Sequence, residues 1–231
     1  MFGLFGIGKL EIESRSICDR GLARQDNQDC LVDDPGRGLF CVADGMGGAA
    51  AGDVASRLVC EGLRKVSFSD DPEDRMRVLN ASIDAANAQI GAYARAHEFP
   101  RMGSTLALLL IGRKSPHEAL IANIGDSRVY RRRGIKLERM TEDHRSSAFS
   151  HLLTRALGVA ETVQTDWYHA SVCKGDVWLV CSDGVHEMLP DSTINALIAR
   201  GGSASDIAER IEQSVRRAGA RDNYSIVVAR T

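Results

Sequence analysis

Hydrophobic positions spaced three to four residues apart predict two pairs of helices. The first pair covers residues 49–66 and about 72–97, and the second pair covers residues 191–200 and 203–219. Pro72 suits the first turn of a helix, and Asp70 or Asp71 would serve as its cap. Ser203 to Asp206 has the spacing of a capping box, so the last helix should begin there.

Shorter apolar runs predict strands between the helix pairs. They cover residues 12–18, 38–43, 105–111, 118–124, 127–132, 177–181 and 225–229, with another candidate at Val172. Residues 105–111 are almost wholly apolar, as in a strand buried on both faces. Connections within the strand runs are as short as hairpins, which favours antiparallel sheets over alternating strand–helix–strand units. The pattern therefore indicates an α+β fold with helices packed outside antiparallel sheets.

Length and charge narrow the class of protein. The 231 residues suit one domain, and 44% hydrophobic residues can form a sizeable core, so we expect a single domain over residues 1–231. With 29 basic and 31 acidic residues, the net charge of -2 gives no basic excess for nucleic acid. No run reaches the ~20 apolar residues of a membrane span. Residues 1–10 are too short for a signal peptide, and we expect a loose leader or an edge strand there.

The six cysteines include no C-x-x-C pair. Cys41 and Cys181 lie within apolar runs, where a free thiol behaves as a small hydrophobic side chain. Reduced core cysteines are typical of a cytoplasmic protein, which is the location we expect.

Five aspartates lie where a predicted buried strand meets a turn: Asp29, Asp44, Asp126, Asp183 and Asp222. Carboxylates that converge without basic partners repel one another, and a divalent cation relieves that repulsion. Ligation by oxygen alone suits Mg²⁺ or Mn²⁺ rather than zinc, and these ions keep waters that a hydrolase can use. A single Asp-Gly pair is ordinary turn chemistry. Five such positions together indicate a metal centre.

Seven short motifs occur in a recognisable order. They are RQDNQD (24–29), ADGMGG (43–48), GST (103–105), IGDSR (124–128), LTRALG (153–158), SDG (182–184) and DN (222–223). Together they resemble the metal-dependent protein phosphatase family (protein phosphatase type 2C, PPM) in its compact bacterial form, over about residues 12–229. The resemblance implies a four-layer αββα sandwich, in which two antiparallel β-sheets pack face to face with a helix pair outside each. It also implies a protein serine/threonine phosphatase that uses two core Mn²⁺ or Mg²⁺ ions and a water bridging them.

The resemblance also assigns roles to residues of these motifs. Asp44 would bridge the two metals, and the Gly45 carbonyl would ligate one of them. Asp183 and Asp222 would hold the first metal from the other sheet. Asp29 would lie beside the second metal, partly through water.

Further matching residues would complete the site. Asp126 matches an aspartate that helps to hold a third, weaker metal in bacterial relatives. Arg24 matches the arginine that grips the substrate phosphate, so it joins Asp44, Asp183 and Asp222 as a catalytic residue. Residues expected to support the site from behind are Gly47, Ser182 and Asn223, together with Thr105, Ser127 and Thr154.

The chain departs from the family pattern in two places. Met46 stands where many relatives have a histidine that could protonate the leaving group, so this proton donor is unassigned. After Thr141 to His144, only residues 145–152 precede the next motif, whereas relatives have a substantial helical flap there. The shortened flap should open the cleft, and it affects third-metal binding and substrate choice. We expect His144 and His151, in this loop, to face solvent.

Two other functions compete with this interpretation. Cys18 and Arg24 have the C-x₅-R spacing of cysteine-dependent phosphatases, in which a thiolate attacks phosphorus. Inhibition by a chelator rather than by thiol alkylation would distinguish the metal mechanism. The fold could also serve as a pseudophosphatase or binding module with a weakened site. For the phosphatase, the expected partner is a phosphorylated protein, acted on by a monomer that opposes a bacterial serine/threonine kinase.

Overall fold

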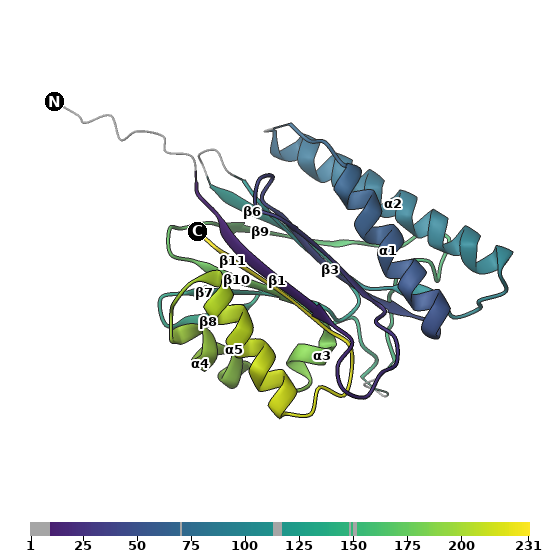
Figure 1. The fold of residues 1–231 in the computed structure, drawn as a ribbon. Helices are drawn as coiled ribbons and strands as arrows, with labels where there is room; N and C mark the ends of the chain where they lie inside the picture. The colour runs from purple at the N-terminus through teal and green to yellow at the C-terminus, as the bar shows by residue number, and fades with distance from the viewer. Residues whose placement is uncertain (1–9, 70, 113–116, 148, 150–151) are drawn as a thin grey trace.

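Two antiparallel sheets stack face to face between two groups of helices, as Figure 1 shows. The computed structural model describes residues 10–69, 71–112, 117–147, 149 and 152–231. Helices α1 and α2 cover one sheet, and α3, α4 and α5 cover the other (Figure 1). This arrangement confirms the predicted α+β sandwich of four layers.

The first sheet has five strands, all paired antiparallel. Its order is β1 (Glu13–Asp19), β11 (Tyr224–Arg230), β10 (Val177–Cys181), β7 (Arg128–Arg133) and β8 (Lys136–Arg139). Strand β8 was not predicted, because its four residues are mostly polar and lie at the edge of the sheet. The first and last predicted strands of the chain thus become neighbours, which brings distant motifs to one end of this sheet.

The second sheet has six antiparallel strands. Its order is β2 (Asp29–Asp34), β3 (Leu39–Met46), β5 (Leu106–Ile111), β6 (Glu118–Ile124) and β9 (Asp166–Ser171), with β4 (Gly103–Ser104) paired to β3. The candidate strand at Val172 is misplaced, because β9 ends one residue earlier. Strand β9 lies at the edge of the sheet, its residues are only partly buried, and its polarity is mixed. Its sequence therefore shows little of the hydrophobic pattern that predicts a strand.

In the part of the chain that the structure describes, five helices complete the fold. They are α1 (Ala49–Lys65), α2 (Pro72–Ala96), α3 (Asp183–His186), α4 (Asp191–Ala199) and α5 (Ala204–Arg217). Four of them confirm the predicted pairs, and the Asp71 carboxylate caps α2 by accepting a hydrogen bond from Glu73 N–H. Asp70, the alternative cap, lies outside the described residues. The four-residue α3 was not predicted, because it is shorter than one full period of an amphipathic pattern.

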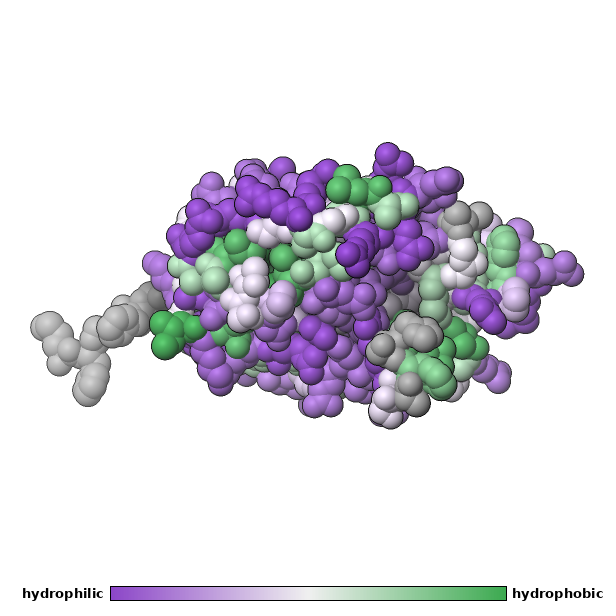
Figure 2. Space-filling model, turned by 90° about the horizontal axis from the view of Figure 1, so that it is seen from below, coloured by the Kyte–Doolittle hydropathy of each residue, from purple (hydrophilic) through white to green (hydrophobic). Residues whose placement is uncertain are grey.

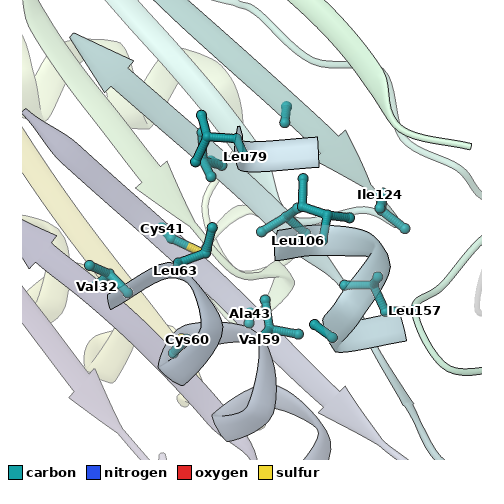
Figure 3. Close-up of a cluster of buried hydrophobic side chains, with 14 of the residues drawn as sticks. Val32, Cys41, Ala43, Val59, Cys60, Leu63, Leu79, Leu106, Ile124 and Leu157 are labelled. Carbon is teal, nitrogen blue, oxygen red and sulfur yellow. The ribbon is translucent and has the colours of Figure 1, made fainter. Parts of the chain in front are cut away.

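Three hydrophobic layers hold these elements together. One lies between the sheets and contains Phe40 and Trp178, and one lies under each group of helices. Figure 3 shows the layer under α1, where Val59 and Leu63 lie beside Ala43 and Cys41 of β3. The inner layer fixes the two sheets relative to each other, and it therefore fixes whatever the strand ends carry.

The surface and the chain start complete the description. In the view from below, hydrophilic residues cover most of the face and hydrophobic residues form separate small groups (Figure 2). Within the described ranges, no helix combines the length and hydrophobicity that crossing a membrane requires. The expected leader, residues 1–10, lies outside the described residues except for Leu10.

The start of α5 provides a test of the fold's local energetics. Ser203 Oγ accepts from Asp206 N–H at 3.1 Å, and the Asp206 carboxylate accepts from Ser203 N–H at 2.8 Å. We predict that Ser203→Ala lowers the free energy of unfolding by about 1 kcal/mol, because it removes this cap. Urea denaturation would measure the change. The control Ser205→Ala, at a half-buried position of the same turn whose hydrogen bond to Glu209 is exposed, should change it by less than about 0.5 kcal/mol.

Candidate active site

Asp29 and Asp44 are opposite each other in the β2–β3 ladder. Asp44 N–H donates to Thr105 Oγ1 at 2.9 Å, and Thr105 N–H donates to the Asp44 carbonyl at 2.8 Å. The Thr105 hydroxyl in turn lies 2.7 Å from Ser127 Oγ. These bonds continue the sheet to the end of β3, so the two carboxylates have a rigid mount. Thr105 and Ser127 thus brace the end of β3 by hydrogen bonds.

The other sheet brings Asp183 and Asp222 to the same end of the sandwich. Asp183 opens α3 two residues after β10, and Asp222 lies two residues before the neighbouring strand β11. Ser182 connects the two sheets, because its Oγ donates to Asp29 Oδ2 at 2.7 Å and accepts from Ser225 N–H at 2.9 Å. Ser182, which precedes Asp183 in the chain, thus links the sheet that carries Asp183 and Asp222 to Asp29 of the other sheet by one direct hydrogen bond.

Asn223 fixes the loop that carries Arg24. Its side-chain amide donates to the carbonyls of Arg20 and Asp26 at 2.9 and 2.8 Å, and its Oδ1 accepts from Gln28 N–H at 2.9 Å. Both N–H donors and the acceptor oxygen of this amide are therefore used on one loop. Asn223 therefore holds the Arg20–Gln28 loop against the start of β11, behind the aspartates.

Two glycines of the motifs are required by close backbone contacts. A Cβ on Gly45 would lie 2.0 Å from the Gly52 carbonyl oxygen, and a Cβ on Gly184 would lie 2.0 Å from the Asn223 carbonyl oxygen. Both distances are far below van der Waals contact, and the obstacle in each case is backbone. These glycines let α1 and β11 approach the residues that follow Asp44 and Asp183.

The predicted site residues meet at one open cavity of about 1060 Å³. Its lining includes Arg24, Asp44, Gly45, Gly47, Asp126, Asp183, Asp222 and Asn223. Asp29 is only 8% exposed and, with the fully buried Ser182, is absent from this lining. The structure thus brings most of the predicted set to the cavity surface and places Asp29 behind it.

Crowding and burial raise the pKa values of carboxylates at the site. Burial, followed by the charges of Asp29 and Asp183, raises the pKa of Asp44 well above its ordinary value. Burial and the charges of Asp126 and Glu187 raise the pKa of Asp183 to about 7. Burial also raises the pKa of Asp29 to about 6, although the hydrogen bond from Ser182 opposes the shift. A bound cation would relieve this stress, since it stabilises the ionised forms.

The donors at the cavity fit Mg²⁺ or Mn²⁺ because they are carboxylate and carbonyl oxygens. Asp29 Oδ1 is buried and has no hydrogen-bond partner among the described residues. Within the same part of the chain, no group of three or more acidic, histidine or cysteine side chains is already placed to hold a metal ion. Arginines pair with the outer carboxylates instead, and Arg24 donates to Asp222 Oδ2 at 2.7 Å.

Two residues of the site were not predicted. Arg145 pairs with Asp126 and Asp183, and Glu187 lies one helical turn after Asp183 and pairs with Arg145. Glu187 could have been found from its i+4 spacing to Asp183. Nothing in the sequence separates Arg145 from any other loop arginine.

The expectation that His144 faces solvent is wrong. Its side chain is buried, its Nδ1 accepts from Gly125 N–H at 3.0 Å, and its Nε2 lies 2.9 Å from Asp166 Oδ2. The His144 side chain therefore anchors its own segment to Gly125 and Asp166. His151 lies outside the described residues.

The C-x₅-R alternative finds no support in the geometry. Arg24 lines the cavity, but Cys18 does not, and Arg24 pairs with Asp222. Although Cys18 is partly exposed, local desolvation and the charge of Asp29 raise the pKa of its thiol. A nucleophilic cysteine needs a lowered pKa, so this thiol is poorly suited to attack phosphorus.

Comparisons with known proteins identify one family. The family model described as "Protein phosphatase 2C" matches residues 15–223. The chain is 30% identical to the serine/threonine phosphatase stp of Listeria welshimeri, over 91% of this chain and 92% of the relative. It superimposes on PppA, described as a key regulatory component of T6SS in Pseudomonas aeruginosa, with a TM-score of 0.91 and 31% identity, over 96% of this chain and 98% of that one. The catalytic domain of PstP in complex with two manganese ions gives a TM-score of 0.85 and 30% identity, over 95% and 97% of the two chains.

The raised pKa values predict how pH affects the metal-free protein. The folded state holds a proton on Asp183 up to about pH 7, whereas the unfolded chain releases it near 3.8. Between these values the free energy of unfolding should therefore fall as pH rises. Chelator-treated protein in urea titrations from pH 4 to 8 would show this fall, and added Mn²⁺ should reverse it at the upper end. The variant Asp183→Asn should flatten the profile; an unchanged slope would contradict the assignment.

Proposed function

The chain belongs to the protein phosphatase 2C family and is a serine/threonine protein phosphatase, and we propose that it hydrolyses phosphoserine and phosphothreonine at the aspartate-lined cavity with two divalent ions. The observation that carries this proposal is the convergence of carboxylates from both sheets on one cavity, with strongly raised pKa values at Asp44 and Asp183. The structure of PstP with two manganese ions, a relative at 30% identity, supports a divalent metal as the cation.

The chain's residues would have separate roles at such a metal centre. When bound, the two ions would supply a Lewis-acid pair that activates water and neutralises phosphate charge. Asp44 and the Gly45 carbonyl would hold the pair from β3, and Asp183 and Asp222 would hold one ion from the other sheet. Asp29 lies buried behind the cavity, and among the described residues its Oδ1 has no hydrogen-bond partner. It would orient the site through this oxygen and through its bond from Ser182. Since no protein side chain attacks phosphorus, no phosphoenzyme is expected.

Arg24 is the proposed substrate clamp. The Arg24 side chain is 57% exposed, and Asp222 holds its guanidinium at the cavity mouth. Asn223 fixes the loop that carries it. A planar guanidinium can donate two parallel hydrogen bonds to a phosphate. An open cavity of about 1060 Å³ can admit a phosphorylated side chain together with its flanking residues. The substrate is therefore proposed to be a phosphoprotein, and a serine/threonine kinase must supply it.

Loss of the central carboxylate tests the proposed function. We predict that Asp44→Asn lowers Mn²⁺-dependent hydrolysis of an aryl phosphate and a phosphopeptide by more than about 100-fold. Mutating a residue that only supports a metal ligand already costs about 10–100-fold, and loss of a ligand should cost more. Asp53→Asn, at an exposed ion pair on α1, should leave the rate unchanged. Steady-state assays would measure both. A wild-type protein that binds Mn²⁺ but hydrolyses neither substrate would favour the binding-module alternative.

Arg24 should affect substrate affinity more than turnover. We predict that Arg24→Ala raises KM with a smaller decrease in kcat, because it removes a contact to the substrate phosphate. Arg24→Lys should recover only part of the loss, since lysine lacks the planar pair of donors. Arg20→Ala, on the same loop, is the matched control. A decrease confined to kcat would contradict the clamp role.

A further inference from the structure

Arg145 lies among three carboxylates at the rim of the cavity. Its Nε donates to Asp126 Oδ2 at 2.5 Å, one terminal nitrogen donates to Asp183 Oδ2 at 3.2 Å, and the other pairs with Glu187 Oε1 at 2.5 Å. Every nitrogen of the guanidinium thus contacts a different acidic residue. One of these residues, Asp126, is the aspartate that the sequence associates with a third metal.

The backbone holds Arg145 in this position. The His144 N–H donates to the Gly125 carbonyl at 2.9 Å, and Gly125 N–H donates to the His144 ring, so two bonds join these residues. Because Asp126 and Arg145 are the next residues along each segment, the bonds place their side chains together. On the other side, Arg145 forms an isolated antiparallel bridge with Leu153, and Thr154 N–H donates to the His144 carbonyl at 2.8 Å. Asp166 fixes the far nitrogen of the same ring.

The Arg145–Asp126 pair is largely removed from water. The Asp126 side chain is 7% exposed and the Arg145 side chain 20%. An ionised carboxylate at that depth needs a permanent positive partner, and arginine stays charged at every physiological pH. Asp183 contacts Arg145 through one oxygen, Oδ2, and a carboxylate has a second oxygen with which it can ligate an ion.

We propose that the Arg145 guanidinium is a built-in cation for Asp126, Asp183 and Glu187, so that this position takes no divalent ion and the centre binds two ions rather than three. The inference rests on the proposed two-ion function and goes beyond it. Asp126 then serves as the partner of Arg145 instead of a metal ligand. The backbone bonds of His144 and the bridge from Arg145 to Leu153 are what hold this arginine at the site.

The number of bound ions tests the proposal without reference to activity. Chelator-stripped protein would be titrated with Mn²⁺, and bound manganese would be measured by equilibrium dialysis and electron paramagnetic resonance. We predict two ions for the wild type and three for Arg145→Ala, because removing the guanidinium leaves Asp126 buried without a cation. Arg133→Ala, which removes an arginine paired with the buried Asp176 outside the cavity lining, should still bind two.

A second variant decides the question if Arg145→Ala does not fold, as circular dichroism would reveal. Asp126→Asn should keep two ions, since Asp126 ligates none in the presence of Arg145. Three ions in the wild type, two in folded Arg145→Ala, or fewer than two in Asp126→Asn would each overturn the inference. A wild type that binds no manganese would instead overturn the two-ion function itself.

Discussion

Repulsion between carboxylates is the constraint on which the rest of this structure depends. Five aspartates from two sheets are held at one end of a sandwich whose inner hydrophobic layer prevents the sheets from moving apart. The fold therefore cannot relieve the repulsion by separating them. It must supply positive charge or protons, and the raised pKa values of Asp29, Asp44 and Asp183 show how far burial favours protons when no metal is present.

The sandwich suits this task because each sheet fixes its acids independently. On one sheet, the Asp29–Asp44 pair is set by the β2–β3 register and by Thr105. On the other, Asp183 and Asp222 flank adjacent strands. The Ser182 hydroxyl donates to Asp29 of one sheet and accepts from the Ser225 N–H of the other, so it can transmit a change at one sheet to the other. A site assembled in this way needs glycine at positions 45 and 184, since α1 and the start of β11 approach the backbone there closely.

The sequence predicted the arrangement of layers and most of the aspartates in the cavity lining, because those depend on local periodicity and on short motifs. Helices α2 and α5 were predictable from their caps, and Asp44 and Asp183 from the glycines that follow them. The polar edge strand β8 and the four-residue α3 were not, because neither is long enough to show a period. The inward turn of His144 depends on Gly125 and Asp166, which are distant in the chain, and no local pattern encodes such a contact.

Arginine and a metal ion solve the same electrostatic problem with different consequences. An ion can exchange, so a site that depends on it responds to the metal concentration around the protein. A guanidinium anchored by the 144–145 backbone cannot leave, and its charge is independent of both metal supply and physiological pH. Its planar donors also fix the carboxylates in direction. An arginine held next to His144 can therefore complete the rim of the cavity with a positive charge that does not exchange.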